Sequence, residues 1–239
     1  MLDIRRLVKH YPVAGGEPVR AVDDVSLRVE RGELVALYGP SGSGKTTLLK
    51  LIAAVLAPDS GEVVVSGRDV TRLSDREAAR YRLREVGFVL QTFHMIAGLS
   101  AIDNAALKLV GTGMSVRAAH QRVTPLLTRL GLDERAEHRV GTLSMGERQR
   151  VAIAKALSTE PGLLLTDEPT GNLDTRRGAE VLALLRELCR ERETAVLLVT
   201  HDPQAAAVAD RSLALRDGRL VAYAPESQPG LPATIRSLQ

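Results

Sequence analysis

A glycine-rich segment that ends in lysine and threonine carries the clearest chemical signal in the sequence. Residues 39–46 read Gly-Pro-Ser-Gly-Ser-Gly-Lys-Thr and match the pattern GxxxxGK[ST]. Glycines let phosphates approach the backbone closely, and a following helix N-terminus attracts them. The lysine of such a loop reaches the β- and γ-phosphates, and the hydroxyl ligates Mg²⁺. We predict a site for ATP and Mg²⁺, with Thr46 as a metal ligand, formed by Gly39, Pro40, Ser41, Gly42, Ser43, Gly44, Lys45, Thr46 and Thr47.

Two carboxylates and a histidine follow two other apolar segments. Asp167 and Glu168 come directly after Leu163–Thr166, and His201 follows Val196–Thr200. A carboxylate near a metal-bound triphosphate can anchor the metal, and a second can orient the attacking water. A neutral imidazole can bond the γ-phosphate. We expect Asp167 to anchor Mg²⁺ through water or another ligand, and Glu168, His201 and Lys45 to act in catalysis.

These residues need strands that bring them to one edge of a sheet. The runs Leu34–Tyr38, Leu163–Thr166 and Val196–Thr200 are apolar without alternation, which is typical of parallel strands covered on both faces. Ligands of open α/β sheets bind beyond the carboxyl ends of such strands. The sequence therefore predicts an α/β fold with its polar segments at that edge.

The remaining patterns divide the chain into a core, a lobe and a tail. Alternating segments predict antiparallel strands at Leu2–Val8, Ser26–Val29, Glu62–Ser66 and a hairpin at Arg211–Ala222. Helical patterns occur at Thr46–Val55, Ala101–Val110, Val116–Leu130, Glu147–Leu157, Arg176–Arg192 and Pro203–Ala209. We predict a discontinuous core of residues 1–91 and 159–222, a helical lobe of residues 92–158, and a tail of residues 223–239 with no core of its own.

Composition excludes several classes of protein. The chain has 239 residues, of which 44% are hydrophobic and 26% charged, so a disordered or low-complexity chain is excluded. A single cysteine, Cys189, excludes a disulfide framework and predicts a small buried residue. The basic residues are dispersed and the net charge is +3, so no nucleic-acid partner is indicated. No apolar run approaches the roughly 18–20 residues of a membrane span, and no signal peptide is visible. We expect a cytoplasmic protein that reaches a membrane only through a partner.

A second candidate anion site begins at Ser144. The segment Leu143–Arg150 reads LSMGERQR and runs into a helix, and Ser144 with Glu147 forms a capping-box pattern. That pattern alone indicates an ordinary helix start. A helix N-terminus with a serine and a glycine can also bind an anion. Both interpretations stay open on these residues alone.

Together these segments resemble the ATPase subunits of ABC transporters over residues 2–222. LSMGERQR resembles the LSGGQ signature, DEPTGNLD resembles Walker B with the D-loop, FVLQ the Q-loop and VTHD the H-loop. The resemblance implies a P-loop NTPase (RecA-like) core with an antiparallel β subdomain and an inserted α-helical signature lobe. It also implies an enzyme that converts ATP and water to ADP and phosphate.

The resemblance assigns further roles. It implies that two subunits pair head to tail, with each ATP held between the P-loop of one chain and Ser144 and Gly146 of the other. Gln91 would contact the metal and the γ-phosphate in catalysis and link them to the helical lobe. Tyr11 falls where the family has an aromatic residue that stacks on adenine, and Asp174 belongs to the D-loop at the nucleotide.

A membrane permease would dock beside the helical lobe. The segment Phe93–Leu99 is relatively apolar through Phe93, Met95, Ile96 and Leu99, and an exposed patch of this kind often marks a partner site. The alternative is that these side chains pack within the lobe. The D-loop sequence, the segment after the Q-loop and the chain length resemble the lipoprotein-release and macrolide-export (MacB-like) type. No cargo or direction of transport is indicated.

One position departs from the family pattern. The second signature residue is usually glycine but is Met145 here. A positive φ at methionine would cost about 1 kcal/mol or more, unless the residue keeps an ordinary backbone and points its side chain away. Two alternatives to a transport-coupled ATPase follow. One is a soluble ABC-type ATPase not coupled to transport, and the other is a hydrolysis-impaired regulatory subunit, which only Met145 favours.

Overall fold

The computed structural model describes residues 1–239 except 91, 93, 172 and 223–239. Within these residues the centre is a six-stranded sheet in the order β10-β9-β3-β8-β7-β6. All neighbouring pairs are parallel except the β9–β10 hairpin. The strands are β3 (Leu34–Tyr38), β6 (Val86–Leu90), β7 (Leu163–Asp167), β8 (Ala195–Thr200), β9 (Arg211–Arg216) and β10 (Arg219–Ala222). The predicted parallel sheet and hairpin are confirmed.

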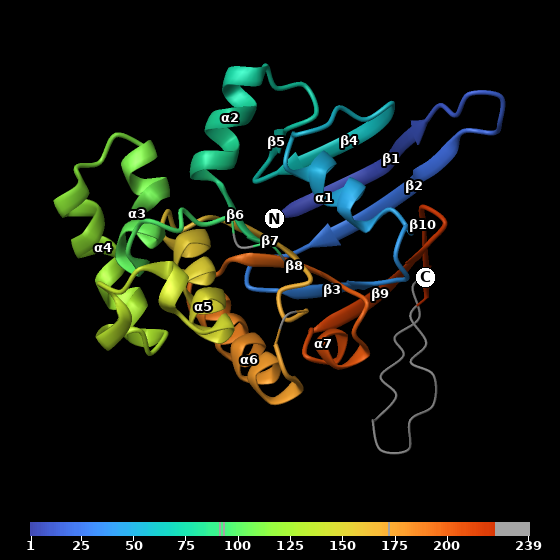
Figure 1. Ribbon diagram of the computed structural model, residues 1–239. Helices are drawn as coiled ribbons and strands as arrows, with labels where there is room; N and C mark the ends of the chain where they lie inside the picture. Colours follow the sequence, from blue (N-terminus) through green and yellow to red (C-terminus); the bar gives the residue numbers. More distant parts are fainter. Residues whose placement is uncertain (91, 93, 172, 223–239) are drawn as a thin grey trace.

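A second, antiparallel sheet packs beside the first (Figure 1). In the described residues it has the order β2-β1-β4-β5, and it contains the three alternating segments that the sequence indicated. Its strands are β1 (Leu2–Tyr11), β2 (Val19–Val29), β4 (Ser60–Val65) and β5 (Arg68–Asp69). β1 and β2 extend beyond their predicted ends, because they continue as a ribbon with register shifts after Ile4.

The helices pack around the parallel sheet, and three of the described helices lie together. α3, α4 and α5 gather at one end of the molecule, away from β1 and β2 (Figure 1). The helices are α1 (Lys45–Ile52), α2 (Asp75–Arg84), α3 (Ala101–Gly111), α4 (Val116–Arg129), α5 (Met145–Leu157), α6 (Thr175–Glu191) and α7 (Pro203–Ala207). Serine N-caps begin α2 to α5, which fixes where these helices start. The boundaries of the core and the helical lobe remain a prediction.

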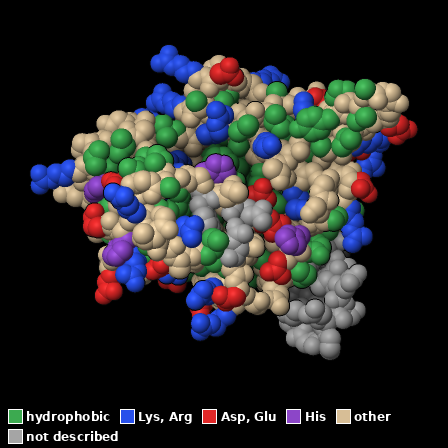
Figure 2. Space-filling model, in the orientation of Figure 1, with side chains coloured by type: hydrophobic (Ala, Val, Ile, Leu, Met, Phe, Trp, Pro, Cys, Tyr) green, Lys and Arg blue, Asp and Glu red, His purple; other side chains and the backbone are tan. Residues whose placement is uncertain are grey.

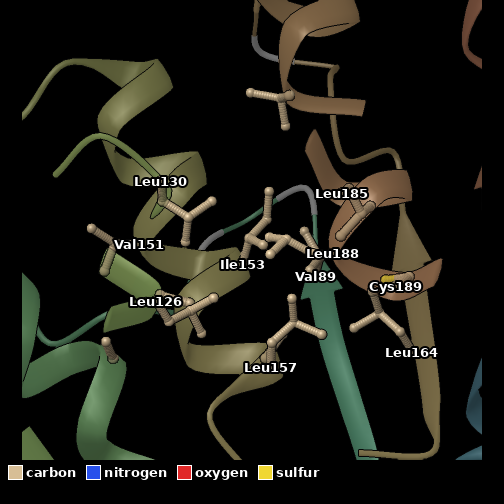
Figure 3. Close-up of a cluster of buried hydrophobic side chains, with 14 of the residues drawn as sticks. Val89, Leu126, Leu130, Val151, Ile153, Leu157, Leu164, Leu185, Leu188 and Cys189 are labelled. Carbon is tan, nitrogen blue, oxygen red and sulfur yellow. The ribbon is translucent and has the colours of Figure 1, made fainter. Parts of the chain in front are cut away.

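The parallel strands send alternate side chains into two separate cores. Val35 and Leu37 of β3 pack with α1 and the antiparallel sheet, whereas Leu34 and Ala36 pack with the helices on the other face. The second core includes Val89, Ile153, Leu164, Leu185 and Cys189 (Figure 3). Cys189 is 1% exposed, as predicted, and burial raises the pKa of its thiol to about 12. Apolar residues on both faces explain why these strands do not alternate in sequence.

Sequence reasoning missed α2 and β6, as well as the two-residue strand β5. α2 is highly polar and buries only Ala78 and Tyr81, so its apolar periodicity is weak, although Ser74 and Glu77 form a capping box. β6 contains Gly87, which is unfavourable in a strand. A Cβ there would lie 2.7 Å from the carbonyl oxygen of Ala156, so close packing of α5 on β6 requires glycine. α1 and α7 end at Ile52 and Ala207, three and two residues before their predicted ends.

Charge is dispersed over the described surface, as the sequence indicated. On the face in Figure 2, the Lys and Arg side chains are interspersed with Asp and Glu. Many exposed charges form ion pairs between elements, such as Arg129 of α4 with Glu187 of α6. No described helix is long and apolar enough to cross a membrane.

Candidate nucleotide-binding site

The loop of residues 39–46 lies between β3 and α1 and is held by close backbone contacts. The amide of Gly39 donates to the carbonyl of Thr200 at 3.3 Å. Gly44 has a φ of 105°, and a Cβ there would lie 1.8 Å from the carbonyl oxygen of Ala21 in β2. Only glycine fits this position, because it adopts the left-handed backbone without strain and has no Cβ to clash with β2. The turn that the motif predicts is therefore present.

The N-terminus of α1 is open to an anion. Its N-cap, Gly44, offers no side-chain hydrogen bond, and its first turn holds no acidic residue. The first amides of a helix lack intrahelical partners and carry a partial positive charge. The buried Lys45 ammonium lies over the same loop, because Nζ donates to the carbonyls of Gly39 and Pro40 at 2.7 Å each. Burial lowers the pKa of Lys45, while Glu168 and Asp167 act in the opposite direction.

Thr46 and Asp167 meet across the site from distant parts of the chain. Thr46 Oγ1 donates to Asp167 Oδ2 at 3.1 Å. Burial raises the pKa of Asp167, and the neighbouring Glu168 charge adds to that rise, so a cation beside this carboxylate would be favoured. No described group of three His, Cys, Asp or Glu residues could hold a metal alone. A hydroxyl and one carboxylate, completed by phosphate oxygens, fit the ligands that Mg²⁺ takes.

Glu168 turns away from Asp167. Its φ of 50° lies in the left-handed region, and its amide donates to the carbonyl of Val199 at 2.9 Å. The Glu168 carboxylate accepts hydrogen bonds from Thr200 Oγ1 at 3.3 Å and from His201 Nδ1 at 2.7 Å. The two adjacent carboxylates therefore serve different partners, Thr46 in one case and the end of β8 in the other.

Thr200 is a site residue that the sequence analysis did not single out. Its hydroxyl donates to Glu168 and accepts from the amide of Asp202 at 2.9 Å, which links the end of β8 to the start of α7. Asp202 caps α7 by accepting from the amide of Gln204 at 2.9 Å, as expected. A hydroxyl residue at the last position of a buried strand, just before a histidine, was the available signal.

Ser144 opens α5 with a complete capping box. The amide of Glu147 donates to Ser144 Oγ at 3.3 Å, and the amide of Ser144 donates to Glu147 Oε2 at 2.8 Å. Hydrogen bonds from Ser144 lower the pKa of Glu147 to about 2, with a further contribution from Arg135. Met145 is the first helical residue, has no positive φ and is 38% exposed. The backbone strain considered for Met145 does not arise.

The signature residues and the phosphate loop are not brought together within the chain. The apolar side of α5, including Val151, Ile153 and Leu157, packs in the core on one face of the parallel sheet, and α1 packs in the core on the other. Asp174 is the N-cap of α6 and accepts from the amide of Arg177 at 3.0 Å. Tyr11 is the last residue of β1, is 37% exposed and has the Lys9 ammonium 6.0 Å from its ring centre.

The docking segment is only partly described. Gln91 and Phe93 lie outside the described residues. Ile96 is 51% exposed, as expected for a partner surface, whereas Met95 packs against the core, as expected for packing within the lobe. Each interpretation therefore applies to part of this patch. The segment is fixed by Asn104, a fully buried residue that sequence reasoning missed. Its side chain accepts from the amide of Ile96 at 2.8 Å and donates to the carbonyls of Ile96 and Ser100 at 3.1 and 2.9 Å.

Comparison with known proteins decides the family. The profile described as ABC transporter matches residues 22–171, which contain the phosphate loop, the α5 start and both carboxylates. This chain belongs to the ABC transporter family. As a member of that family it binds ATP and hydrolyses it, and its P-loop NTPase fold with an antiparallel sheet is confirmed.

Relatives and solved structures agree with this assignment. The lipoprotein-releasing system ATP-binding protein LolD 2 of Chlorobaculum tepidum is 44% identical over 228 residues, covering 93% of this chain and 92% of that protein. The macrolide export ATP-binding/permease protein MacB of Hahella chejuensis is 44% identical over 209 residues. This match covers 87% of the present chain but 32% of MacB, so the chain spans about a third of that relative.

A solved ABC transporter cassette has the same fold. The dimeric structure of MJ0796 matches with a TM-score of 0.83 and 36% identity, covering 92% of this chain and 96% of that one. A second structure of MJ0796 is a dimeric post-hydrolysis state bound to ADP and Pi, with the same TM-score and identity.

Proposed function

We propose that two copies of this ABC transporter subunit close head to tail around two ATP molecules and drive a separate membrane subunit. The observation that carries the proposal is the separation of the two helix starts. α1 offers an open anion site with a lysine, and α5 offers Ser144 and Gly146, yet the two helices pack on opposite faces of one sheet. A second chain is needed to complete the site, and the relative MJ0796 is dimeric.

In this dimer the groups at the end of β7 and β8 carry out hydrolysis. Lys45 and the loop amides bind the phosphates, and Tyr11 stacks on adenine. Glu168 accepts a proton from the water that attacks the γ-phosphorus in line, and the bond to the bridging oxygen breaks to give ADP and phosphate. Thr200 and His201 orient the Glu168 carboxylate through their hydrogen bonds.

Thr46 and Asp167 are the residues that would hold Mg²⁺, with Gln91 as a third candidate. The ion would neutralise charge on the phosphates when it is bound. The closeness of the Thr46 hydroxyl and the Asp167 carboxylate supports this assignment. Asp174, at the N-cap of α6, is proposed to contact the nucleotide region from the D-loop.

The membrane subunit is proposed to dock at residues 93–99. The names of the relatives LolD and MacB support coupling to lipoprotein release or macrolide export, through a permease or a mechanotransmitter. The exposed Ile96 and the loop held by Asn104 support a docking surface there. The subunit would then lie on the cytoplasmic side of the cell membrane, peripheral to it.

Glu168→Gln tests this function most directly. The change keeps the size of the side chain and removes the proton acceptor, so hydrolysis should fall by about 100-fold or more while ATP–Mg²⁺ binding persists. Because ATP bound by both chains favours closure, chromatography should show a monomer without nucleotide and a dimer with ATP–Mg²⁺.

Asp202→Asn is a matched control, since it changes a nearby carboxylate that caps α7. It should keep most of the parent ATPase rate. Hydrolysis by the Glu168 variant at the parent rate would exclude Glu168 as the base. ATP binding without dimer formation at micromolar concentration would contradict the shared site.

A further inference from the structure

A cavity with two lysines lies beside the proposed docking segment. Its volume is about 140 Å³, and it is lined by Phe88, Leu90, His94, Lys108, Ala152, Lys155 and Ala156. Phe88 and Leu90 come from β6, the edge strand of the parallel sheet, and the lysines come from α3 and α5. His94 belongs to residues 93–99, so the cavity is continuous with that segment. None of these side chains serves the nucleotide site.

Both ammonium groups are held in place and incompletely satisfied. Lys108 Nζ donates to the carbonyl of Val86 at 2.6 Å, and Lys155 Nζ donates to the carbonyl of His94 at 2.8 Å. An ammonium has three hydrogens to donate, so each retains hydrogen-bonding capacity. Within the described residues, neither lysine forms an ion pair with a carboxylate.

This arrangement is unfavourable for the isolated chain. Burial lowers the pKa of Lys108 to about 8, and the charge of Lys155 contributes to that shift. Burial also lowers the pKa of Lys155. Two like charges lie beside an apolar floor of Phe88, Leu90 and alanines. One anionic group would offset both their mutual repulsion and the cost of burying them. A partner that buries apolar surface and presents a carboxylate complements this cavity in shape and charge.

We propose that the cavity receives an aspartate or glutamate side chain of the membrane subunit, with its carboxylate between Lys108 and Lys155. The inference rests on the proposed function, because it specifies the chemistry of the docking partner. The apolar floor takes the aliphatic part of the acidic residue and its neighbours, and the exposed Ile96 extends the contact. A free phosphate would not use the apolar floor.

Reversing the charge of each lysine tests the proposal in the full complex. The chain is co-expressed with its membrane subunit, and the amount of membrane subunit retained on the tagged chain is measured. Lys108→Glu and Lys155→Glu should each lower retention at least about tenfold, because a buried charge would lose its partner. Lys108→Met keeps the aliphatic stem and should also lower retention, which covers the case that Lys108→Glu folds poorly.

Arg117→Glu is the matched control, since Arg117 is an exposed cation on the neighbouring α4. It should leave retention unchanged. The basal ATPase rate of each isolated variant that folds should stay near that of the parent. Changing acidic residues of the cytoplasmic loops of the membrane subunit to lysine, one at a time, should identify one that restores binding to Lys108→Glu.

The outcomes separate the two proposals. Folded lysine variants that retain the membrane subunit like the parent would overturn the carboxylate cavity and leave the proposed function intact. So would loss of retention that no acid-to-lysine change restores. A parent chain that retains no membrane subunit would overturn the proposed function together with this inference.

Discussion

The starts of α1 and α5 are both glycine-containing helix N-termini, but they are completed in opposite ways. α1 begins at Gly44 with no side-chain cap and no acidic residue in its first turn, and it carries Lys45. α5 begins with Ser144 and Glu147, which satisfy each other's amides, and it carries a carboxylate. The first helix start leaves its positive end to a ligand, whereas the second satisfies much of its own hydrogen bonding.

The difference indicates which role each helix start has in nucleotide binding and dimer formation. An open N-terminus with a buried lysine gains most from an anion, so α1 should supply most of the affinity for phosphate. A capped N-terminus is rigid without a ligand, so α5 should contribute positioning and dimer closure rather than affinity. Changes at α1 should therefore remove ATP binding, and changes at α5 should remove the dimer or alter stability.

The largest effect is expected at α1. Lys45→Ala should weaken ATP binding by at least about 100-fold, because charge-assisted hydrogen bonds to several phosphate charges are lost. Lys50→Ala changes an exposed lysine in the last turn of the same helix and should bind ATP like the parent. Calorimetric titration with ATP–Mg²⁺ measures both. Equal affinity in a folded Lys45 variant would contradict the assignment of the loop.

At α5 the expected loss is the dimer. Ser144→Arg, added to Glu168→Gln, should abolish the ATP-dependent dimer by filling the anion site, while ATP binding to the monomer stays within about threefold of the parent. Ser74→Arg removes the same kind of capping box from α2 and should leave the dimer intact. Light scattering with and without ATP–Mg²⁺ distinguishes them. Dimer loss in both variants would mean that helix capping alone is responsible.

A smaller effect on ATP binding is expected at Tyr11, which is proposed to contact the nucleotide bound at α1 and to have no role at α5. Tyr11→Ala should weaken ATP binding by roughly 1–2 kcal/mol, the scale of an aromatic contact, and Tyr11→Phe should change it little. Competition binding of ATP and a nucleotide with a different base measures the contribution. If both variants bind like the parent, Tyr11 is only a residue at the end of β1.

The smallest effect concerns the stability of the α5 start. Glu147→Ala should lower the free energy of unfolding at pH 7 by about 1 kcal/mol, as for loss of a capping box. The folded pKa of Glu147 is about 2, below the unfolded value near 4.5, so its charge stabilises above pH 4.5 and this contribution is lost as pH falls toward 2. Urea unfolding at pH 7 and pH 3 should show a smaller difference between parent and variant at pH 3. A difference independent of pH would assign the effect to capping geometry instead.

Local signals in the sequence predicted much of the fold but missed features that depend on packing. The three apolar strands, the β9–β10 hairpin and the serine-capped helices α3 to α5 were predictable, because their patterns lie within a few neighbouring residues. β6 was missed because Gly87 is explained only by α5 packing against it. Thr200 and Asn104 were missed because their importance comes from partners that no motif identifies.

The candidate site shows the same division. The sequence by itself determined the phosphate loop and the α5 cap, since glycine, serine and glutamate fix backbone conformation and hydrogen bonding over four to eight consecutive residues. Only the tertiary structure decided that Thr46 meets Asp167, that Glu168 turns toward Thr200 and His201, and that Lys108 and Lys155 share a cavity. These contacts depend on strand register and on helices packed across a sheet, which short-range preferences do not specify.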